Sequence, residues 1–362
     1  MSKQTVIPFG PQHPVLPEPV HLDLVVEDEV VVDAVPQIGY VHRGLEKLVE
    51  TKDYTKYVYV CERICGICSF GHSYGYSQTV EGMMGIEIPD RAEYLRAIMH
   101  ELSRIHSHLL WLGLAADAFG FENLFYQCWK LRETVLDIFE RTTGGRVILS
   151  YCNVGGVKKD IDNSELQAIV IELDKLLEDY DILVKTFTED FSVRERMCGS
   201  GYLSKADADA LSVVGPFARA SGLEHDIRMC GNGAYGDLVA FEPIVSDGCD
   251  NMARVEVRCK EVYQSVDIIK ELVSKIPDGE VMVKVKGNPE DGARFVNHLE
   301  QPRGECVYYT KGNGTKFLDR FRIRTPTSAN LAGLVQILKG CKLADVPLNV
   351  LSIDPCISCT ER

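Results

Sequence analysis

The sequence predicts an α+β fold that is predominantly helical, with a central bundle of long helices between an N-terminal and a C-terminal β-hairpin. Three observations support this prediction. Apolar residues recur at intervals of three and four in the middle of the chain, valine-rich stretches alternate in part near its start, and a Gly-Asn-Gly turn separates two strand-like stretches near its end. We divide the chain into three interdependent segments, residues 1–60, 61–300 and 301–362.

The N-terminal segment begins with the first hairpin. Residues 21–26 and 30–35 are the expected strands, and the acidic residues 27–29 form the turn between them. Residues 40–59 have a mixed pattern with a short helix near Leu45. A loop and then a helix over residues 72–84 follow.

The clearest helix begins at Asp90, which forms an expected capping pair with Glu93. Its apolar stripe runs from Leu95 to Ala116 in steps of three and four. The remaining elements are listed in chain order: helices over residues 122–142, 163–188, 205–211 and 250–276, strands over residues 304–310 and 316–324, and a last helix over residues 328–340.

Composition excludes several classes of function. The chain has 362 residues, of which 45% are hydrophobic, and a formal net charge of −14. Such an acidic protein is poorly suited to bind nucleic acid, so we expect no nucleic-acid partner. No apolar run approaches the roughly 18 residues of a membrane span. Thirteen cysteines without a secretory signal indicate reduced thiols in the cytoplasm.

Two C-x-x-C pairs lie at opposite ends of the chain and carry most of the functional information. The first is Cys65 with Cys68, followed by His72, and the second is Cys356 with Cys359. Each pair can bind one soft metal ion, and both together can supply four thiolates. The chain must then fold back on itself so that its two ends meet at one buried centre.

Several kinds of site use such cysteines. Structural zinc is the commonest, an iron–sulfur cluster is the next, and a thioredoxin-like dithiol would use only one pair. A zinc ribbon separates its pairs by roughly 15–20 residues, whereas here almost the whole chain lies between them. Cys61 also completes a triplet typical of radical SAM enzymes, but those enzymes are barrels, and the centre of this chain is helical.

The motifs around both pairs resemble those of the nickel–iron hydrogenase large subunit. Residues 63–72 have the pattern Arg-x-Cys-Gly-x-Cys-x-x-x-His, and residues 354–359 have the pattern Asp-Pro-Cys-x-x-Cys. Residues 10–14 and 38–47 also resemble the large subunit of the quinone-binding module of complex I, a type of subunit that lacks the four cysteines. Together these features resemble the membrane-bound, energy-converting group of Ech-type hydrogenases.

The resemblance implies a cofactor and its ligands. Cys65, Cys68, Cys356 and Cys359 would bind nickel, and Cys68 and Cys359 would also bridge to an iron that carries carbonyl and cyanide ligands. His72 would donate a hydrogen bond to a bridging sulfur, and Asp354 would orient the site. The implied activity is reversible heterolytic cleavage of H2, or proton reduction, in which Cys359 is also a catalytic residue.

Four further residues enter through the same resemblance. Glu18 stands, displaced by one position, where the family has a proton-relaying glutamate, and Arg303 stands where the family brings an arginine over the open metal position. Many hydrogenases bind a third metal ion with a glutamate, matched here by Glu46, and a C-terminal histidine. Arg362 replaces that histidine. Because a cation cannot ligate a metal, we expect no third metal site.

The resemblance also implies partners. No cysteine spacing outside the two pairs is typical of an iron–sulfur cluster, so none is expected within this chain. A small subunit with a 4Fe-4S cluster would carry electrons derived from ferredoxin. Further iron–sulfur subunits and integral, antiporter-like membrane subunits would couple the reaction to ion translocation and hold the chain on the cytoplasmic face of the cell membrane. The alternatives are a complex I-like quinone-module subunit and a structural-zinc scaffold protein.

Overall fold

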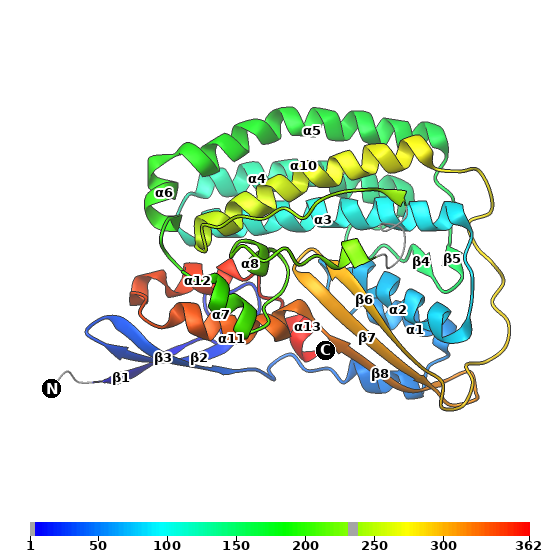
Figure 1. Ribbon diagram of the computed structural model, residues 1–362, viewed down its shortest axis with the longest axis horizontal. Helices are drawn as coiled ribbons and strands as arrows, with labels where there is room; N and C mark the ends of the chain where they lie inside the picture. Colours follow the sequence, from blue (N-terminus) through cyan, green and yellow to red (C-terminus); the bar gives the residue numbers. More distant parts are fainter. Residues whose placement is uncertain (1–3, 231–237) are drawn as a thin grey trace.

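The computed structural model describes residues 4–230 and 238–362. Within them, long helices form one layer, and two small sheets and several short helices lie beneath it (Figure 1). The helices are α1 (Tyr54–Glu62), α2 (Ser69–Met84), α3 (Asp90–Ala118), α4 (Glu122–Thr143), α5 (Asn163–Glu189), α6 (Phe191–Met197), α7 (Lys205–Ala210), α8 (Pro216–Arg219), α10 (Asn251–Lys275), α11 (Pro326–Leu338), α12 (Val346–Ser352) and α13 (Ile357–Glu361). Short 3₁₀ helices are η1 (Leu45–Glu50), η2 (Ile227–Cys230) and η3 (Leu343–Asp345).

The strands of residues 4–230 and 238–362 form three antiparallel sheets. They are β1 (Thr5–Phe9), β2 (His21–Glu27) and β3 (Val30–Gln37) in the first sheet, β4 (Cys152–Asn153) and β5 (Gly156–Val157) in the second, and β6 (Arg294–Gln301), β7 (Gly304–Gly312) and β8 (Leu318–Arg324) in the third. Both predicted hairpins are therefore present, but each belongs to a three-stranded sheet. The sequence prediction missed β1 and β6.

The predicted central bundle is confirmed. Helix α3 packs against α4 and α10, and α5 packs against α4 and α10, so that the four long helices run side by side (Figure 1). The Asp250 side chain caps α10 by accepting a hydrogen bond from the Ala253 N–H, at 2.9 Å. Helix α4 is followed by Gly144, whose φ of 84° suits the left-handed position at a helix C-terminus.

The predicted capping pair at the start of α3 is wrong. The residue before the helix is Pro89, and Asp90 is already the first helical residue. Pro89, at the N-cap position, makes no capping hydrogen bond through its side chain. Asp90 and Glu93 instead place two acidic groups in the first turn, where negative charge interacts favourably with the helix dipole.

Helix α2 lies unusually close to the β6–β8 sheet, and this contact determines the position of His72. A Cβ atom at Gly75 would lie 2.3 Å from the Tyr308 ring, and one at Gly82 would lie 2.3 Å from the Phe295 ring. Both distances are shorter than a van der Waals contact, so only glycine allows this approach. A glycine in a helix interior weakens the helix by about 1 kcal/mol relative to alanine. These two glycines nevertheless allow α2 to pack directly against β6 and β7.

Candidate metal centre

The four cysteines of the two C-x-x-C pairs meet in the main hydrophobic core. Cys65 lies in the turn between α1 and α2, and Cys68 precedes the first residue of α2. Cys356 precedes α13, and Cys359 lies within it. The Sγ atoms of Cys65 and Cys356 are 3.2 Å apart, and those of Cys65, Cys68 and Cys359 all lie within 4.8 Å of one another. The two ends of the chain therefore converge, as the sequence predicted.

The donor chemistry at this point fits a soft metal. All four side chains are at most 5% exposed, and burial disfavours a group of uncompensated thiolates. Hydrogen bonds from the Cys356, Cys359 and Cys68 thiols hold the pKa of Cys65 well below its usual range, whereas burial raises the pKa of Cys359. A bound cation would allow all four to ionise together, because metal binding displaces thiol protons.

His72 lies beside this cluster and is completely buried. Its Nε2 is 3.3 Å from the Sγ of Cys359, and its Nδ1 is 3.1 Å from the Tyr308 hydroxyl. Burial lowers the His72 pKa to about 4, so the ring is neutral at physiological pH. A neutral ring whose Nε2 carries the proton can donate to sulfur while its Nδ1 accepts from Tyr308.

Arg303 approaches the cluster from the turn between β6 and β7. Its Nη1 donates to the Sγ of Cys68 at 3.2 Å, and its Nη2 lies 2.8 Å from the Asp354 carboxylate. Its Nε donates to the Asp354 carbonyl at 3.0 Å. Asp354, at φ 55°, directly precedes Pro355 and Cys356. Arginine and aspartate thus form a buried ion pair beside the thiols.

Glu18 contacts the second cysteine pair. Its carboxylate accepts hydrogen bonds from the backbone N–H groups of Ile357 and Ser358 and from the Ser358 hydroxyl. Ile357 follows Cys356 directly. The hydrogen bond to Cys65 and burial raise the Cys356 pKa, and the negative charge of Glu18 adds to this shift. A partly buried carboxylate therefore lies next to this thiol.

An apolar cavity of about 350 Å³ adjoins the same residues. Glu18, Cys65, Cys356 and Arg303 contribute to one part of its wall. The rest of the wall is mostly apolar and includes Ile67, Leu110, Trp111, Leu114, Trp129 and Leu351. Small apolar molecules could reach the thiols through such a space, whereas charged solutes would lose their hydration there.

Two hydrogenases are similar in sequence to this chain over nearly its whole length. The subunit alpha of a membrane-bound hydrogenase from Pyrococcus furiosus is 35% identical over 98% of this chain and 87% of its own. A carbon monoxide-induced hydrogenase from Rhodospirillum rubrum is 36% identical over 100% of both chains. The family model described as respiratory-chain NADH dehydrogenase, 49 Kd subunit, matches residues 119–290 and 285–362, and that of nickel-dependent hydrogenase matches residues 43–115.

The chain belongs to the family of energy-converting hydrogenase large subunits and complex I 49-kDa subunits. A solved structure has the same fold. It is a chain of a membrane-bound sulfane sulfur reductase, an archaeal respiratory membrane complex. The two chains superpose with a TM-score of 0.93 over 99% of this chain and 98% of that chain, and they are 29% identical in sequence. The predicted fold class is thereby confirmed. In the described parts of the chain, no helix is long and apolar enough to cross a membrane.

Two residues that link the segments of the two cysteine pairs were not predicted from the sequence as functional candidates. Arg43 donates to the carbonyls of Arg63 and Ile64 beside the first cysteine pair and to that of Ser358 beside the second. Glu361 accepts from the backbone of the loop that carries Arg43. Their partners are mainly backbone groups far away in sequence, so no spacing pattern could have identified this role.

Glu46 and Arg362, where we expect no third metal site, belong to a cluster of ion pairs. The Oε1 of Glu46 lies 2.8 Å from the Nε of Arg362, and its other oxygen pairs with Arg322. The backbone N–H of Ile323 also donates to Glu46. The Arg362 guanidinium thus supplies positive charge at this carboxylate and links the C-terminus to η1 and β8.

This cluster predicts a pH-dependent stability. Partial burial disfavours the Glu46 charge, but hydrogen bonds and attraction from Arg362, with Arg322 and Ile323, outweigh it and lower the Glu46 pKa below 4.5. A carboxylate with a lowered pKa stabilises the fold above about pH 4.5 and loses that contribution as the pH falls through its folded pKa. Glu46→Gln should therefore reduce the free energy of unfolding at pH 7 by about 1–3 kcal/mol, and by much less at pH 3.

Urea unfolding of the purified subunit at both pH values measures this difference. Glu50→Gln is the matched control, because Glu50 pairs only with the exposed Lys47 in the described structure. Such a pair contributes at most about 1 kcal/mol. An equal loss for Glu46→Gln at pH 3 and pH 7 would contradict the electrostatic explanation.

Proposed function

We propose that the chain is the catalytic subunit of a nickel–iron hydrogenase, which cleaves H2 heterolytically and reversibly or reduces protons. The observation that carries the proposal is the meeting of four buried cysteines at one point, where His72 and Arg303 direct N–H groups at two of the sulfurs. Cys65, Cys68, Cys356 and Cys359 would hold nickel, and Cys68 and Cys359 would also hold iron with carbonyl and cyanide ligands. When bound, this centre supplies the electrophile that polarises H2.

The surrounding residues have separate tasks in this proposal. His72 orients Cys359 and stabilises negative charge on its sulfur through the hydrogen bond. Asp354 holds the Arg303 guanidinium in one orientation, and Arg303 stabilises negative charge at Cys68. The initial proton acceptor is a terminal thiolate, one that binds nickel alone, and of the two such thiolates Cys356 adjoins Glu18. Glu18 exchanges the proton onward to solvent, since it lies beside the second cysteine pair and is only partly buried.

The rival functions are a complex I-like quinone-module subunit and a structural-zinc scaffold. The family also contains complex I subunits, so membership alone does not decide between them. Four converging thiols favour a soft metal over a quinone, and donors directed at the sulfurs favour a reactive centre over structural zinc. The test is exchange of D2 gas with water by the complex purified from its host. Release of HD and H2 supports the proposal, and metal-loaded complex without exchange contradicts it.

The proposal includes partners that pass electrons to the site. A small subunit with a 4Fe-4S cluster would dock beside the first cysteine loop, and further iron–sulfur and antiporter-like membrane subunits would hold the chain on the cytoplasmic face of the cell membrane. The membrane-bound complexes of relatives support this assembly. Direct docking of ferredoxin is disfavoured, because ferredoxins are typically acidic and this chain carries a net charge of −14.

We therefore expect the metal-loaded subunit alone not to reduce protons with reduced ferredoxin, while the whole complex does so. Gas chromatography of evolved H2 compares the two preparations at equal nickel content. Exchange of D2 with water, which requires no electron partner, checks that the isolated subunit is intact. Equal ferredoxin-dependent rates would contradict the proposed electron route.

A further inference from the structure

The turn that carries Arg303 is held by direct contact with another backbone segment. Strand β6 ends at Gln301 and β7 begins at Gly304, so Pro302 and Arg303 alone form the connection. Gly215 packs on this turn: a Cβ atom added to Gly215 would lie 2.3 Å from the Arg303 carbonyl oxygen. One added to Gly304 would lie 2.7 Å from the Gly215 nitrogen. Only glycine permits this backbone contact.

A buried asparagine holds the segment that contains Gly215. The Oδ1 of Asn330 accepts a hydrogen bond from the Val214 N–H at 2.9 Å, and its Nδ2 donates to the Val214 carbonyl at 3.3 Å. Asn330 is 1% exposed and lies on α11. On the same helix, the Thr327 hydroxyl accepts from the Cys356 N–H at 3.0 Å. Helix α11 therefore contacts both the second cysteine pair and the segment that supports Arg303.

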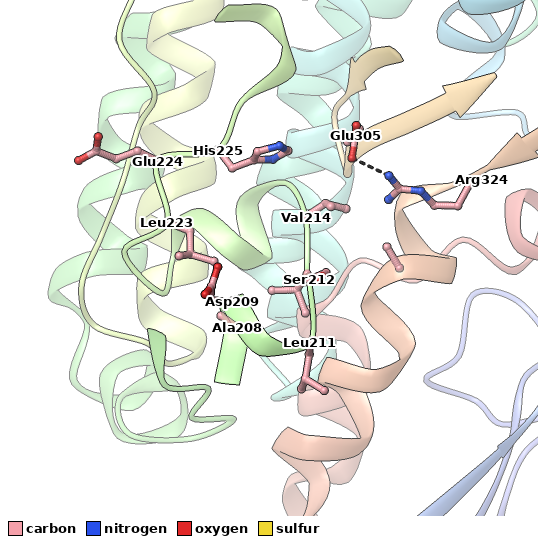
Figure 2. A pocket seen from close by; sticks show the side chains of 12 residues that line it. Ala208, Asp209, Leu211, Ser212, Val214, Leu223, Glu224, His225, Glu305 and Arg324 are labelled. Carbon is pink, nitrogen blue, oxygen red and sulfur yellow. Dashed lines mark hydrogen bonds and ion pairs between the residues drawn. The ribbon is translucent and has the colours of Figure 1, made fainter. Parts of the chain in front are cut away.

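A pocket borders the contact between Gly215 and the Arg303 turn. Val214 and Glu305, the neighbours of Gly215 and Gly304, both line a pocket of about 560 Å³, together with Ser212, His225 and Arg324 (Figure 2). Close-packed protein would confine the 212–215 segment by itself. The segment borders this pocket, and the two hydrogen bonds of Asn330 hold Gly215 against the Arg303 turn.

We propose that Gly215 and Asn330 are positioning residues for Arg303, which keep its guanidinium on the Cys68 sulfur. This inference rests on the proposed function, because it assigns the contact a role in H2 chemistry. Arg303 reaches Cys68 through one N–H at 3.2 Å. A displacement of about 1 Å can lower a rate roughly a hundredfold when it misaligns a reacting group. Weakening the contacts of Gly215 and Asn330 should therefore lower the reaction rate without removing a metal ligand.

The test is a double-mutant cycle in the complex matured in its host. Asn330→Ala should retain nickel and iron and lower D2–water exchange about ten- to hundredfold. In an Arg303→Lys background, where the guanidinium is already absent, Asn330→Ala should lower the remaining rate less than twofold. The carbonyl and cyanide infrared bands should shift on Asn330→Ala in the same direction as on Arg303→Lys.

Matched variants separate positioning from general damage. Asn251→Ala removes another buried asparagine, whose Nδ2 donates to Ser200 and Asn349, and should change neither the rate nor the bands. If Asn330→Ala does not accumulate, Asn330→Asp retains an acceptor for the Val214 N–H and should show a smaller loss. Gly215→Ala should lose exchange as Arg303→Lys does, whereas Gly340→Ala, also at positive φ but with open space around it, should not.

Two results would overturn the positioning role. One is an equal loss from Asn330→Ala in the wild-type and Arg303→Lys backgrounds, and the other is a loss of rate with unshifted bands. Failure of the proposed function itself is distinguishable, because the wild-type complex would then show neither exchange nor the infrared bands.

Discussion

Cys68→Ser complex, matured in its host, is expected to contain neither nickel nor iron. Cys68 is proposed to bind both metals, and its sulfur is buried beside those of Cys65 and Cys359. A serine hydroxyl is a hard donor that stays protonated at neutral pH, so it replaces a bridging thiolate poorly. Metal analysis and D2–water exchange of the purified complex measure the outcome, which we expect to be complete loss of both.

Arg303→Lys is the matched control for this loss. Arg303 donates to the same sulfur but is not a proposed ligand. The lysine variant should retain both metals yet lose most turnover, because an ammonium group cannot reproduce the planar fork that joins Asp354 to Cys68. Active, metal-loaded Cys68→Ser complex would contradict the ligand assignment, and metal-free Arg303→Lys complex would show that the arginine is needed for assembly.

Glu18→Gln should retain both metals and lose H2 evolution and D2–water exchange by a factor of about 10² to 10⁴, the usual contribution of a proton-transferring group. Glutamine preserves the side-chain shape and one oxygen acceptor for the Ile357 and Ser358 N–H groups. It cannot release a proton. Gas chromatography and mass spectrometry of the gas phase follow the two activities.

Glu62→Gln provides the comparison for Glu18. Glu62 is buried near the first cysteine pair, where it pairs with Arg63 and Ser150. Its replacement should leave exchange within a few-fold of the wild type. Normal exchange in Glu18→Gln together with loss in Glu62→Gln would move the proton route to the side of the first pair.

The sequence predicted those parts of the fold in which local pattern and tertiary structure agree. The stripe from Leu95 to Ala116 gave α3, and Pro277 correctly limited the extent of α10. Strand β6 was missed because residues 294–301 mix charged, polar and apolar side chains, and their burial arises from contact with α2 and β7. The apolar stripe did not predict how much of α3 is buried. Glu101, Arg104 and His108 are fully buried, because Glu101 pairs with Arg104 and Arg228 and His108 is hydrogen-bonded to Glu261.

The site was predictable where its chemistry lies in short motifs. The two cysteine pairs and His72 lie within such motifs, and the structure brings them together. Arg303 was predicted from the same resemblance, and in the structure its guanidinium pairs with Asp354. Asn330, Thr327 and Gly215 gave no signal, because each acts through the backbone of a residue distant in sequence.

Metal analysis combined with infrared spectroscopy of the complex purified from its host tests the central claim most directly. The account predicts about one nickel and one iron per copy of this chain, with bands from metal-bound carbonyl and cyanide, because four buried thiols converge at one point beside His72 and Arg303. One zinc per chain and no such bands would contradict the account.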